Sequence, residues 1–354
     1  MKLLILTQKV DKDDPILSFF HRWIEEFANY CDKLTVICLA KGRSELPVAI
    51  KVLSLGKPAQ GWSASGGERL RQKFSAWLNF YKFIWHERKN YDTVFVHMNQ
   101  EYVLLGALVW KLLGKKILLW RNHPRGNWLT RLAVWLSDRV FCTSEFSFTA
   151  RFNKTTIMPV GIDTNRFRRD PLVVHKPNSI LFLSRMSPIK KPEILIDALH
   201  LLAGQGIDFT AALVGDPLPK DQNYYQSLGD AVKKYQLANQ IQFIKGVPNE
   251  QTPAFYNTYE IFVNLTPTGS LDKTIFEAMA CESLVLTSNL SLALILPAGF
   301  VFKEGQANDL AVKLKGIFSL TKDGKEDLGR NFRQVVKNKH SLSLLAGKIT
   351  RRQG

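Results

Sequence analysis

Cysteine is scarce in this sequence, and its few cysteines are not arranged to do chemistry. The 354-residue chain has four of them, Cys31, Cys38, Cys142 and Cys281. No two form a Cys-x-x-Cys pair, and none has a histidine at the spacing of a zinc site. We therefore expect reduced thiols, as in a cytosolic protein.

Long apolar runs are also missing. No stretch approaches the roughly 18 apolar residues that a membrane-spanning helix needs. The start, Met1 to Thr7, is too short for the apolar region of a signal peptide and is better explained as a buried strand. We expect a cytoplasmic protein, with peripheral association at the inner face of the cell membrane.

Two familiar fingerprints are absent. A nicotinamide dehydrogenase needs Gly-x-Gly-x-x-Gly after a strand, and this pattern does not occur. The sequence also has no helix-turn-helix, zinc or RNA-recognition signature. We expect no nucleic-acid partner. A basic nucleic-acid-binding protein is still the competing class, and steeply salt-dependent binding to DNA or RNA would distinguish it.

Acidic residues are outnumbered by basic ones. Asp and Glu total 31 against 48 Lys and Arg, which gives a formal net charge of +17. Such an excess indicates an anionic partner, which could be nucleic acid, an anionic membrane surface or a phosphorylated ligand. A solvated basic surface without a specific partner is the alternative.

The length and the alternation of strand and helix patterns predict two α/β domains with parallel sheets. Pro159 and Gly161 interrupt regular structure between the two halves. We expect a first domain at 1–160, a second at 161–335, and a C-terminal helix or tail at 336–354 that packs back on the first. The predicted strands are 3–6, 34–39, 50–55, 93–97, 116–120, 140–143, 179–183, 209–214, 241–244, 261–265 and 284–286. The predicted helices are 19–30, 68–89, 102–113, 129–137, 193–205, 224–235, 252–257, 273–281, 310–318 and 327–338.

The stretch Val263–Asn289 is the most informative part of the chain. A short apolar strand leads into a Pro- and Gly-containing loop, and Asp272 is a good N-cap for the helix that follows. A helix that opens after a strand presents free backbone N–H groups to phosphate or sugar hydroxyls. Glu277 lies one turn inside the helix, on the same side as Lys273, where its carboxylate can accept two ribose hydroxyls.

These residues resemble the donor-binding segment of family 4 glycosyltransferases, whose second motif Glu lies in Glu-Ala-Met-Ala, as Glu277 does here. Four further segments resemble the family in the same order. They are 141–145, 158–167, 183–191 and 214–216, and Phe243-x-x-Gly246 is similar to its base-pocket strand. The resemblance implies the GT-B fold, with two Rossmann-like domains whose sheets face each other across a cleft. It also implies a retaining enzyme that needs no metal and no cofactor.

The resemblance assigns roles to particular residues. Arg185 and Lys190 would clamp the diphosphate of the donor and stabilise the charge of the leaving group. His123 would position acceptor and donor sugar, and we count it with those two as catalytic. His97, Arg121 and Arg125 are acceptor-side candidates. The expected donor-binding residues are Gly215, Lys245, Gly246, Val247, Gly269, Ser270, Leu271, Asp272, Lys273 and Glu277.

The chain departs from the family pattern at three places. Position 269 is Gly, where the family has its first motif Glu, so the donor sugar must be held differently. Lys191 replaces the family's usual Gly. The acidic segment 9–15 replaces a Gly-Gly turn, and we expect it to bind acceptor hydroxyls rather than phosphate.

The helix predicted at 68–89 has one strongly apolar stripe flanked by basic residues. Such a stripe is typical of a helix packed on a sheet, which we favour, and also of a helix lying on anionic lipid. The stripe consists of Leu70, Phe74, Trp77, Leu78, Tyr81, Ile84 and Trp85.

The sequence thus predicts a hexosyltransferase that moves a sugar from a UDP- or GDP-linked donor to a glycan or lipid-linked acceptor in cell-surface glycan or glycolipid assembly. A GT-B-like protein that binds sugar nucleotide without transfer is the alternative. Donor sugar, acceptor, linkage and oligomeric state are left open.

Overall fold

We describe a computed structural model that covers residues 1–14, 17–58, 61–63, 65–269 and 271–350 of the chain. The chain divides into two compact units. Unit 1 comprises residues 1–161 together with 342–354, and unit 2 comprises residues 162–341. The chain therefore leaves unit 1 after Gly161 and returns to it at Leu342.

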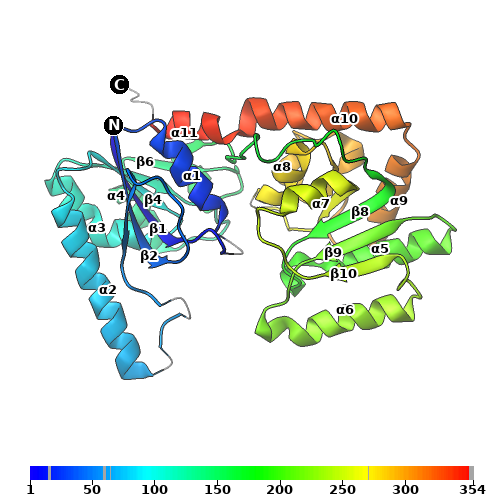
Figure 1. The fold of residues 1–354 in the computed structure, drawn as a ribbon, viewed down its shortest axis with the longest axis horizontal. Coiled ribbons are helices and arrows are strands. Elements are labelled where there is room, and N and C mark those ends of the chain that lie inside the picture. The colour runs from blue at the N-terminus through cyan, green and yellow to red at the C-terminus, as the bar shows by residue number, and fades with distance from the viewer. Residues whose placement is uncertain (15–16, 59–60, 64, 270, 351–354) are drawn as a thin grey trace. The chain divides into compact units, whose positions relative to one another are not determined.

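Unit 1 is built on a parallel sheet of seven strands in the order β3-β2-β1-β4-β5-β6-β7 (Figure 1). Apolar residues with strand periodicity bury both faces of its central strands, as a parallel sheet covered by helices requires. The strands are β1 Lys2–Val10, β2 Lys33–Lys41, β3 Lys51–Ser54, β4 Thr93–His97, β5 Lys116–Trp120, β6 Arg139–Cys142 and β7 Thr155–Ile157.

Helices cover the two faces of this sheet in separate layers. On one face, α1 (Phe19–Ala28) and α11 (Leu342–Thr350) lie next to each other and share a core with Leu3, Ile5 and Phe95 of the strands (Figure 1). The other face is covered by α2 Gly66–His86, α3 Glu101–Leu112 and α4 Trp128–Leu136.

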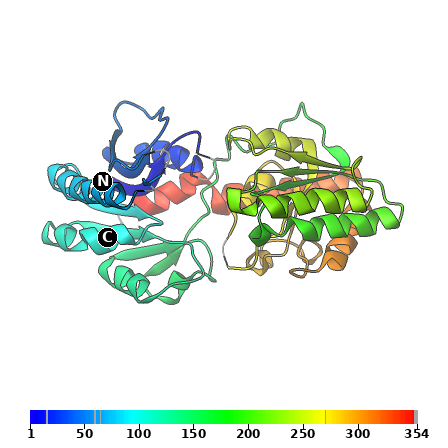
Figure 2. The ribbon, with the colours of Figure 1, turned by 90° about the horizontal axis from the view of Figure 1, so that it is seen from below.

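Unit 2 contains a parallel sheet of five strands in the order β10-β9-β8-β11-β12. The strands are β8 Lys176–Leu183, β9 Thr210–Val214, β10 Ile241–Ile244, β11 Tyr259–Asn264 and β12 Leu284–Thr287. Figures 1 and 2 show α5 and α6 on one side of this sheet, with α7, α8 and α10 on the other. The helices of unit 2 are α5 Pro192–Gly204, α6 Gln222–Lys234, α7 Thr252–Thr258, α8 Lys273–Ala280, α9 Ala307–Phe318 and α10 Lys322–Val335.

The helix predicted at 327–338 is α10, with different bounds, and the C-terminal helix expected within 336–354 is α11. Helix α10 begins at Lys322 and ends at Val335, a π-helical turn follows over Val336–His340, and α11 is a separate helix. Leu342, Leu345, Ala346 and Ile349 of α11 join the core beside α1. The end of the chain is thus part of unit 1.

The face by which α2 packs on the sheet differs from the predicted stripe. The helix is anchored by Ala76, Phe80 and Ile84, which are buried. Of the seven residues in the predicted stripe, Ile84 is buried and Tyr81 is half-buried, while the other five are exposed. The prediction that this helix packs on the sheet is therefore correct, but the predicted packing face is wrong.

Candidate active site

The candidate residues of unit 2 follow four neighbouring strands. β8, β9, β10 and β11 end at Leu183, Val214, Ile244 and Asn264, and the predicted donor-site loops begin directly after them. Because neighbouring strands are parallel, these loops meet at one edge of the sheet. This is the edge at which open α/β sheets bind their ligands.

Hydrogen bonds donated by backbone N–H groups join the loops that follow β8, β9 and β10. Met186 N donates to Asp216 O at 3.2 Å, and Gly246 N donates to the carboxylate of Asp216 at 3.1 Å. Gly215 has a φ of +148°, and a Cβ there would lie 1.9 Å from the carbonyl oxygen of Ser184. Position 215 therefore needs glycine so that the two loops can approach each other.

The start of α8 is capped as predicted. Asp272 accepts hydrogen bonds from the backbone N of Thr274 at 3.4 Å and from the hydroxyl of Thr274 at 3.1 Å. The backbone of Asp272 is extended, which is the usual conformation of an N-cap residue. The predicted N-cap is thus confirmed.

Lys190 reaches this cap from the loop after β8. Its Nζ lies 2.7 Å from Oδ2 of Asp272 and 3.0 Å from the hydroxyl of Thr266. Burial alone would raise the pKa of Asp272, but Lys190 and the hydrogen bonds from Thr274 and Thr266 outweigh it and lower that pKa to about 2. Asp272 is therefore ionised, and Lys190 is held beside the N-terminus of α8.

Arg185, the second member of the predicted clamp, is placed differently. Its side chain is exposed. Among the described residues, no ion pair joins its guanidinium to Asp272, which pairs with Lys190 instead. The structure thus brings Lys190 to the α8 terminus and leaves Arg185 in the solvent-facing part of the same loop.

Glu277 is the most deeply buried acid of the candidate site, with 4% of its surface exposed. Tyr256 OH donates to one carboxylate oxygen at 3.2 Å, and Asn249 Nδ2 donates to the other at 3.3 Å. Burial raises the pKa of Glu277, opposed by the charge of Lys273 one turn earlier on α8. Each oxygen keeps a further lone pair that can accept a ligand hydroxyl.

Two of these contacts were not anticipated from the sequence. Tyr256 lies on α7 and Asn249 just before it, more than 20 residues from Glu277, and no spacing rule links them to the Glu-Ala-Met-Ala segment. Tyr256 could be predicted only as a buried aromatic residue. Its role as a hydrogen-bond donor depends on how α7 packs against α8.

The departures from the family pattern have clear structural consequences. Gly269 has a φ of +140°, a region that residues with a side chain rarely adopt, so this loop does not follow a path suited to glutamate. Lys191 has a φ of +50° and a ψ of +40°, the left-handed conformation that glycine would supply. The turn before α5 is therefore left-handed although it lacks glycine. Leu271 is half-buried, and Ser270 lies outside the described residues.

The base-side candidates Lys245, Gly246 and Val247 follow β10 directly. Lys245 and Gly246 are exposed and Val247 is half-buried. Their backbone is anchored through the hydrogen bond from Gly246 to Asp216. These residues are thus positioned at the same sheet edge as Lys190 and the start of α8.

In unit 1, His97 is the last residue of β4 and is only 2% exposed. Its ring stacks on Phe20 with centroids 3.8 Å apart, and Nδ1 lies 3.2 Å from the hydroxyl of Thr7. The sequence made His97 an acceptor-side candidate, a role that needs a ring open to the ligand. Instead it is packed in the core, because α1 covers the end of β4 with aromatic side chains.

The loop after β5 brings the other acceptor-side candidates together. His123 is exposed, and its Nδ1 accepts a hydrogen bond from Arg125 N at 3.0 Å. Arg121 donates to Arg125 O at 2.9 Å, and its Nη1 is buried without a hydrogen-bond partner among the described residues. Burial lowers the pKa of Arg121.

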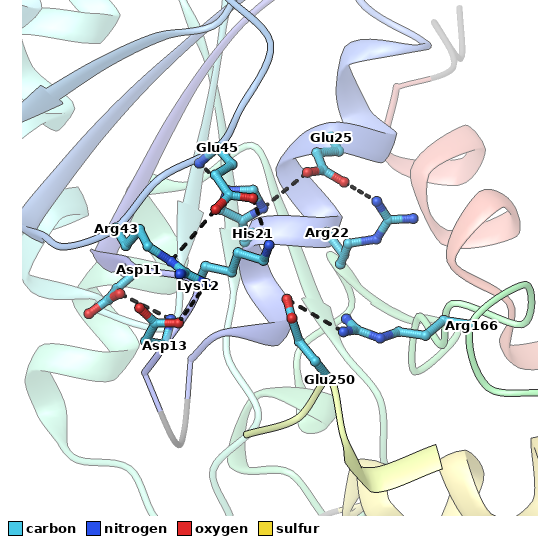
Figure 3. Close-up of polar contacts among 10 residues, drawn as sticks. All are labelled: Asp11, Lys12, Asp13, His21, Arg22, Glu25, Arg43, Glu45, Arg166 and Glu250. Carbon is cyan, nitrogen blue, oxygen red and sulfur yellow. Dashed lines mark hydrogen bonds and ion pairs between the residues drawn. The ribbon is translucent and has the colours of Figure 1, made fainter. Parts of the chain in front are cut away.

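Cations pair with the acidic segment after β1, and Figure 3 shows one of these pairs, Asp13 with Arg43. Lys9 lies 2.8 Å from Asp11 and 2.9 Å from Asp14, and Asp13 lies 3.1 Å from Arg43. Asp11 and Asp13 have the spacing of an acidic metal-binding pair, but both are engaged in ion pairs. Within the described parts of the chain, no group of three or more His, Cys, Asp or Glu side chains is arranged to hold a metal ion.

Residues 163–335 match the family model described as "Glycosyl transferases group 1", and this span lies within unit 2. Unit 2 is similar to the group 1 glycosyltransferases over nearly its whole length. The family resemblance seen in the sequence is thereby confirmed. The GDP-mannose-dependent alpha-(1-6)-phosphatidylinositol monomannoside mannosyltransferase of Mycolicibacterium smegmatis is 28% identical to this chain over 114 residues, which span 30% of this chain and 28% of that protein.

Solved structures that cover both units have the same fold. The Anabaena protein Alr3699/HepE, crystallised with UDP, superposes with a TM-score of 0.77 at 20% identity, covering 99% of this chain and 98% of that one. Sucrose-phosphate synthase from Thermosynechococcus elongatus gives 0.76 at 15% identity, over 99% and 97%. The predicted GT-B fold with two Rossmann-like units is confirmed. Of the helices in the described ranges, none has the length and apolar character to cross a bilayer.

Proposed function

We propose that this chain is a glycosyltransferase that moves a hexose-type sugar from a UDP- or GDP-linked donor to an acceptor hydroxyl. The Anabaena protein was crystallised with UDP and with UDP-glucose, and the mycobacterial relative is named for GDP-mannose. UDP and UDP-glucose are ligands of the Anabaena protein, and GDP-mannose is part of the name of the mycobacterial enzyme. They support the nucleotide-sugar class for this chain without choosing the base.

The observation that carries the proposal is the buried carboxylate of Glu277 beside the N-terminal end of α8. A carboxylate at 4% exposure, held by Tyr256 and Asn249, is a preorganised acceptor for a pair of vicinal hydroxyls. The ribose of a nucleoside diphosphate offers such a pair. The free N–H groups at the start of α8 suit the adjoining phosphates.

The cations at this edge suit the chemistry of donor cleavage. As the glycosidic bond breaks, negative charge builds up on the leaving diphosphate, and fixed cations stabilise that charge more than the ground state. Lys190 is fixed by Asp272 and Thr266, and Arg185 is exposed at the same loop. His123 lies in the loop after β5 of unit 1. We propose that His123 positions the acceptor and the donor sugar.

The remaining parts of the proposal concern stereochemistry and setting. We propose retention at the anomeric carbon and transfer without a metal or another cofactor. The acceptor is a glycan or a lipid-linked sugar in cell-surface glycan or glycolipid assembly, reached by peripheral association with the inner face of the membrane. Activity that survives chelation with EDTA would support metal independence, and loss of activity restored by Mn²⁺ or Mg²⁺ would refute it.

The donor site is tested by calorimetric titration of UDP and GDP into wild type and Glu277→Gln. We expect micromolar binding of one nucleotide, weakened at least tenfold by the substitution, which corresponds to about 1.4 kcal/mol. The matched control is Glu304→Gln, which removes the same charge from an exposed side chain of unit 2. Binding of neither nucleotide to wild type, or equal binding to both variants, would refute the donor site.

The glycine at position 269 favours a second candidate function, in which the protein binds a sugar nucleotide without transferring the sugar. At this position the chain offers no side-chain oxygen to the sugar, and the backbone is in a region suited to glycine. Nucleotide binding with no release of UDP or GDP from the matching sugar donor, with any acceptor tried, would favour this candidate. Sustained nucleotide release would exclude it.

A further inference from the structure

The outer surface of the α2, α3 and α4 layer in unit 1 carries many large apolar side chains that face solvent. We call this set the α2–α4 surface. Soluble proteins rarely gather so many exposed apolar side chains in one place unless the surface meets a partner. Its members are Leu70, Phe74, Trp77, Leu78 and Trp85 of α2, Leu105, Leu108 and Leu112 of α3, and Trp128, Leu132 and Trp135 of α4.

Contacts between the helices show that these side chains belong to one continuous layer. The hydroxyl of Tyr81 on α2 donates to the backbone oxygen of Leu105 on α3 at 3.0 Å. On the far side of α3, Lys111 Nζ lies 5.4 Å from the ring centre of Trp135 on α4. The apolar stripes of the three helices are therefore neighbours.

On α2 the exposed stripe is separate from the packing face. Ala76, Phe80 and Ile84 hold the helix on the sheet, whereas Trp77 is 43% exposed and Trp85 is 53% exposed. Residues 66–75, the first half of the helix, are all exposed or half-buried. Figure 1 shows this half of α2 extending past the strands of the unit 1 sheet. The stripe is thus not explained by the core of unit 1.

Basic residues accompany the stripe. Within the bounds of the three helices there are six Lys and Arg residues against two acids, Glu68 and Glu101, each in the first turn of its helix. The guanidinium of Arg88 lies 4.6 Å from the ring centre of Trp85, so a cation and an exposed aromatic ring are in direct contact. The six basic residues are Arg69, Arg71, Lys73, Lys82, Lys111 and Arg131.

We propose that the α2–α4 surface docks on an anionic lipid bilayer, with its tryptophans at the headgroup level and its Lys and Arg on the lipid phosphates. Tryptophan prefers the membrane interface, and basic residues beside an apolar face bind anionic lipid. A second copy of the chain would present the same positive surface, and the two would repel each other. The proposal rests on the proposed membrane-associated function and specifies the surface that performs it.

Vesicle sedimentation tests the docking surface on the full chain. The lipids are phosphatidylcholine alone and phosphatidylcholine mixed with phosphatidylglycerol. The apolar variant is Trp77→Ser with Trp85→Ser, matched by Leu290→Ser with Leu294→Ser, which are exposed in unit 2. The charge variant is Lys73→Glu with Lys82→Glu, matched by the exposed pair Lys322→Glu with Lys337→Glu. All the substituted side chains are exposed, and circular dichroism together with titration of the nucleotide that binds wild type checks that each variant is folded.

We expect wild type to sediment with the anionic vesicles far more than with the neutral ones. Both α2 variants should bind the anionic vesicles at least tenfold more weakly, and both controls should bind like wild type. No sedimentation of wild type, or equal loss in the controls, would overturn the proposal. A wild-type dimer that becomes monomeric in the Trp variant and ignores vesicles would assign the surface to a second copy instead. Nucleotide binding is measured separately, so a failed donor site and a failed docking surface give different results.

Discussion

Asp272 has two structural roles at the sheet edge of unit 2 where β8 and β11 end. It caps α8 through Thr274, and it fixes the ammonium group of Lys190. An ammonium group has three donors, and Lys190 uses two of them on Asp272 and Thr266. Among the described residues the third donor has no partner, so it can serve a ligand. The contact with Asp272 therefore orients Lys190 and leaves it able to meet a phosphate oxygen.

The low pKa of Asp272 makes its contribution to stability depend on pH. A carboxyl whose pKa is lowered in the folded state stabilises the fold above its unfolded pKa of 3.8, and this contribution is lost as the pH falls towards about 2. We expect Asp272→Asn to lower the free energy of unfolding of unit 2 by on the order of 2 kcal/mol at neutral pH. Asparagine is also a good N-cap, so the cap is preserved.

Chemical denaturation of wild type and Asp272→Asn between neutral pH and pH 2 measures this effect. The stability difference should shrink as the pH falls from about 4 towards 2. Asp323→Asn is the matched control, because it removes an exposed carboxylate from the first turn of α10. A difference for Asp272→Asn that stays constant over the whole range would contradict the assigned ion pair.

Lys191 shows that a left-handed turn can form without the glycine that would make it predictable from the sequence. Lysine stands here in place of the family's usual glycine, and a residue with a side chain normally avoids the left-handed region. The structure keeps that region at Lys191, where Nζ also pairs with Glu304 at 2.7 Å. A residue with a side chain thus adopts the left-handed region at this position, immediately before α5.

At the scale of elements, the sequence was informative wherever a segment had one clear apolar pattern. The strands 93–97, 116–120 and 241–244 were predicted with the bounds that the structure has. The strand β7 was missed, because Thr155-Thr156-Ile157 is too short and too polar to form a pattern. The candidate site followed the same rule. Loops directly after strands were placed, whereas partners from other elements, such as Tyr256, depend on packing.

Helix α2 shows a limit of periodicity. It has two apolar stripes side by side, one with Phe80 and one with Phe74, and spacing alone does not say which one packs on the sheet. The larger stripe was chosen, but the structure buries the smaller one. The outcome is physically reasonable, because Ala76 lets the helix backbone come close to the strands.

The two phenylalanines of α2 give a matched test of this arrangement. Phe80 is 1% exposed and Phe74 is 57% exposed, and both stand on the same helix. Phe80→Ala should lower the free energy of unfolding of unit 1 by about 3–5 kcal/mol because it empties a core position. Phe74→Ala should change it by no more than about 0.5 kcal/mol. Urea denaturation measures both, and a large loss for Phe74→Ala would show that the exposed stripe is in fact part of a packed interface.

At the scale of the whole molecule, the chain has two compact units, and the helix at its C-terminal end completes the core of the first unit. Trp23 donates its Nε1 hydrogen to Gly161 O at 3.0 Å, at the point where the chain leaves unit 1. The returning helix α11 then buries Leu345 in the same core. Unit 1 thus depends on residues from both ends of the chain, whereas unit 2 is continuous over 162–341.

A pair of leucines tests whether the two units unfold separately. Leu345 in α11 and Leu314 in α9 are both completely buried, the first in unit 1 and the second in unit 2. Each change to alanine should lower the stability of its own unit by about 2–5 kcal/mol. Calorimetry with and without the bound nucleotide identifies the transition of unit 2, because a ligand raises the melting temperature of the unit that binds it. Leu314→Ala should lower the nucleotide-shifted transition and Leu345→Ala the other one. If Leu345→Ala moved both transitions equally, the chain would unfold as one cooperative body, and the stability of unit 2 would depend on α11.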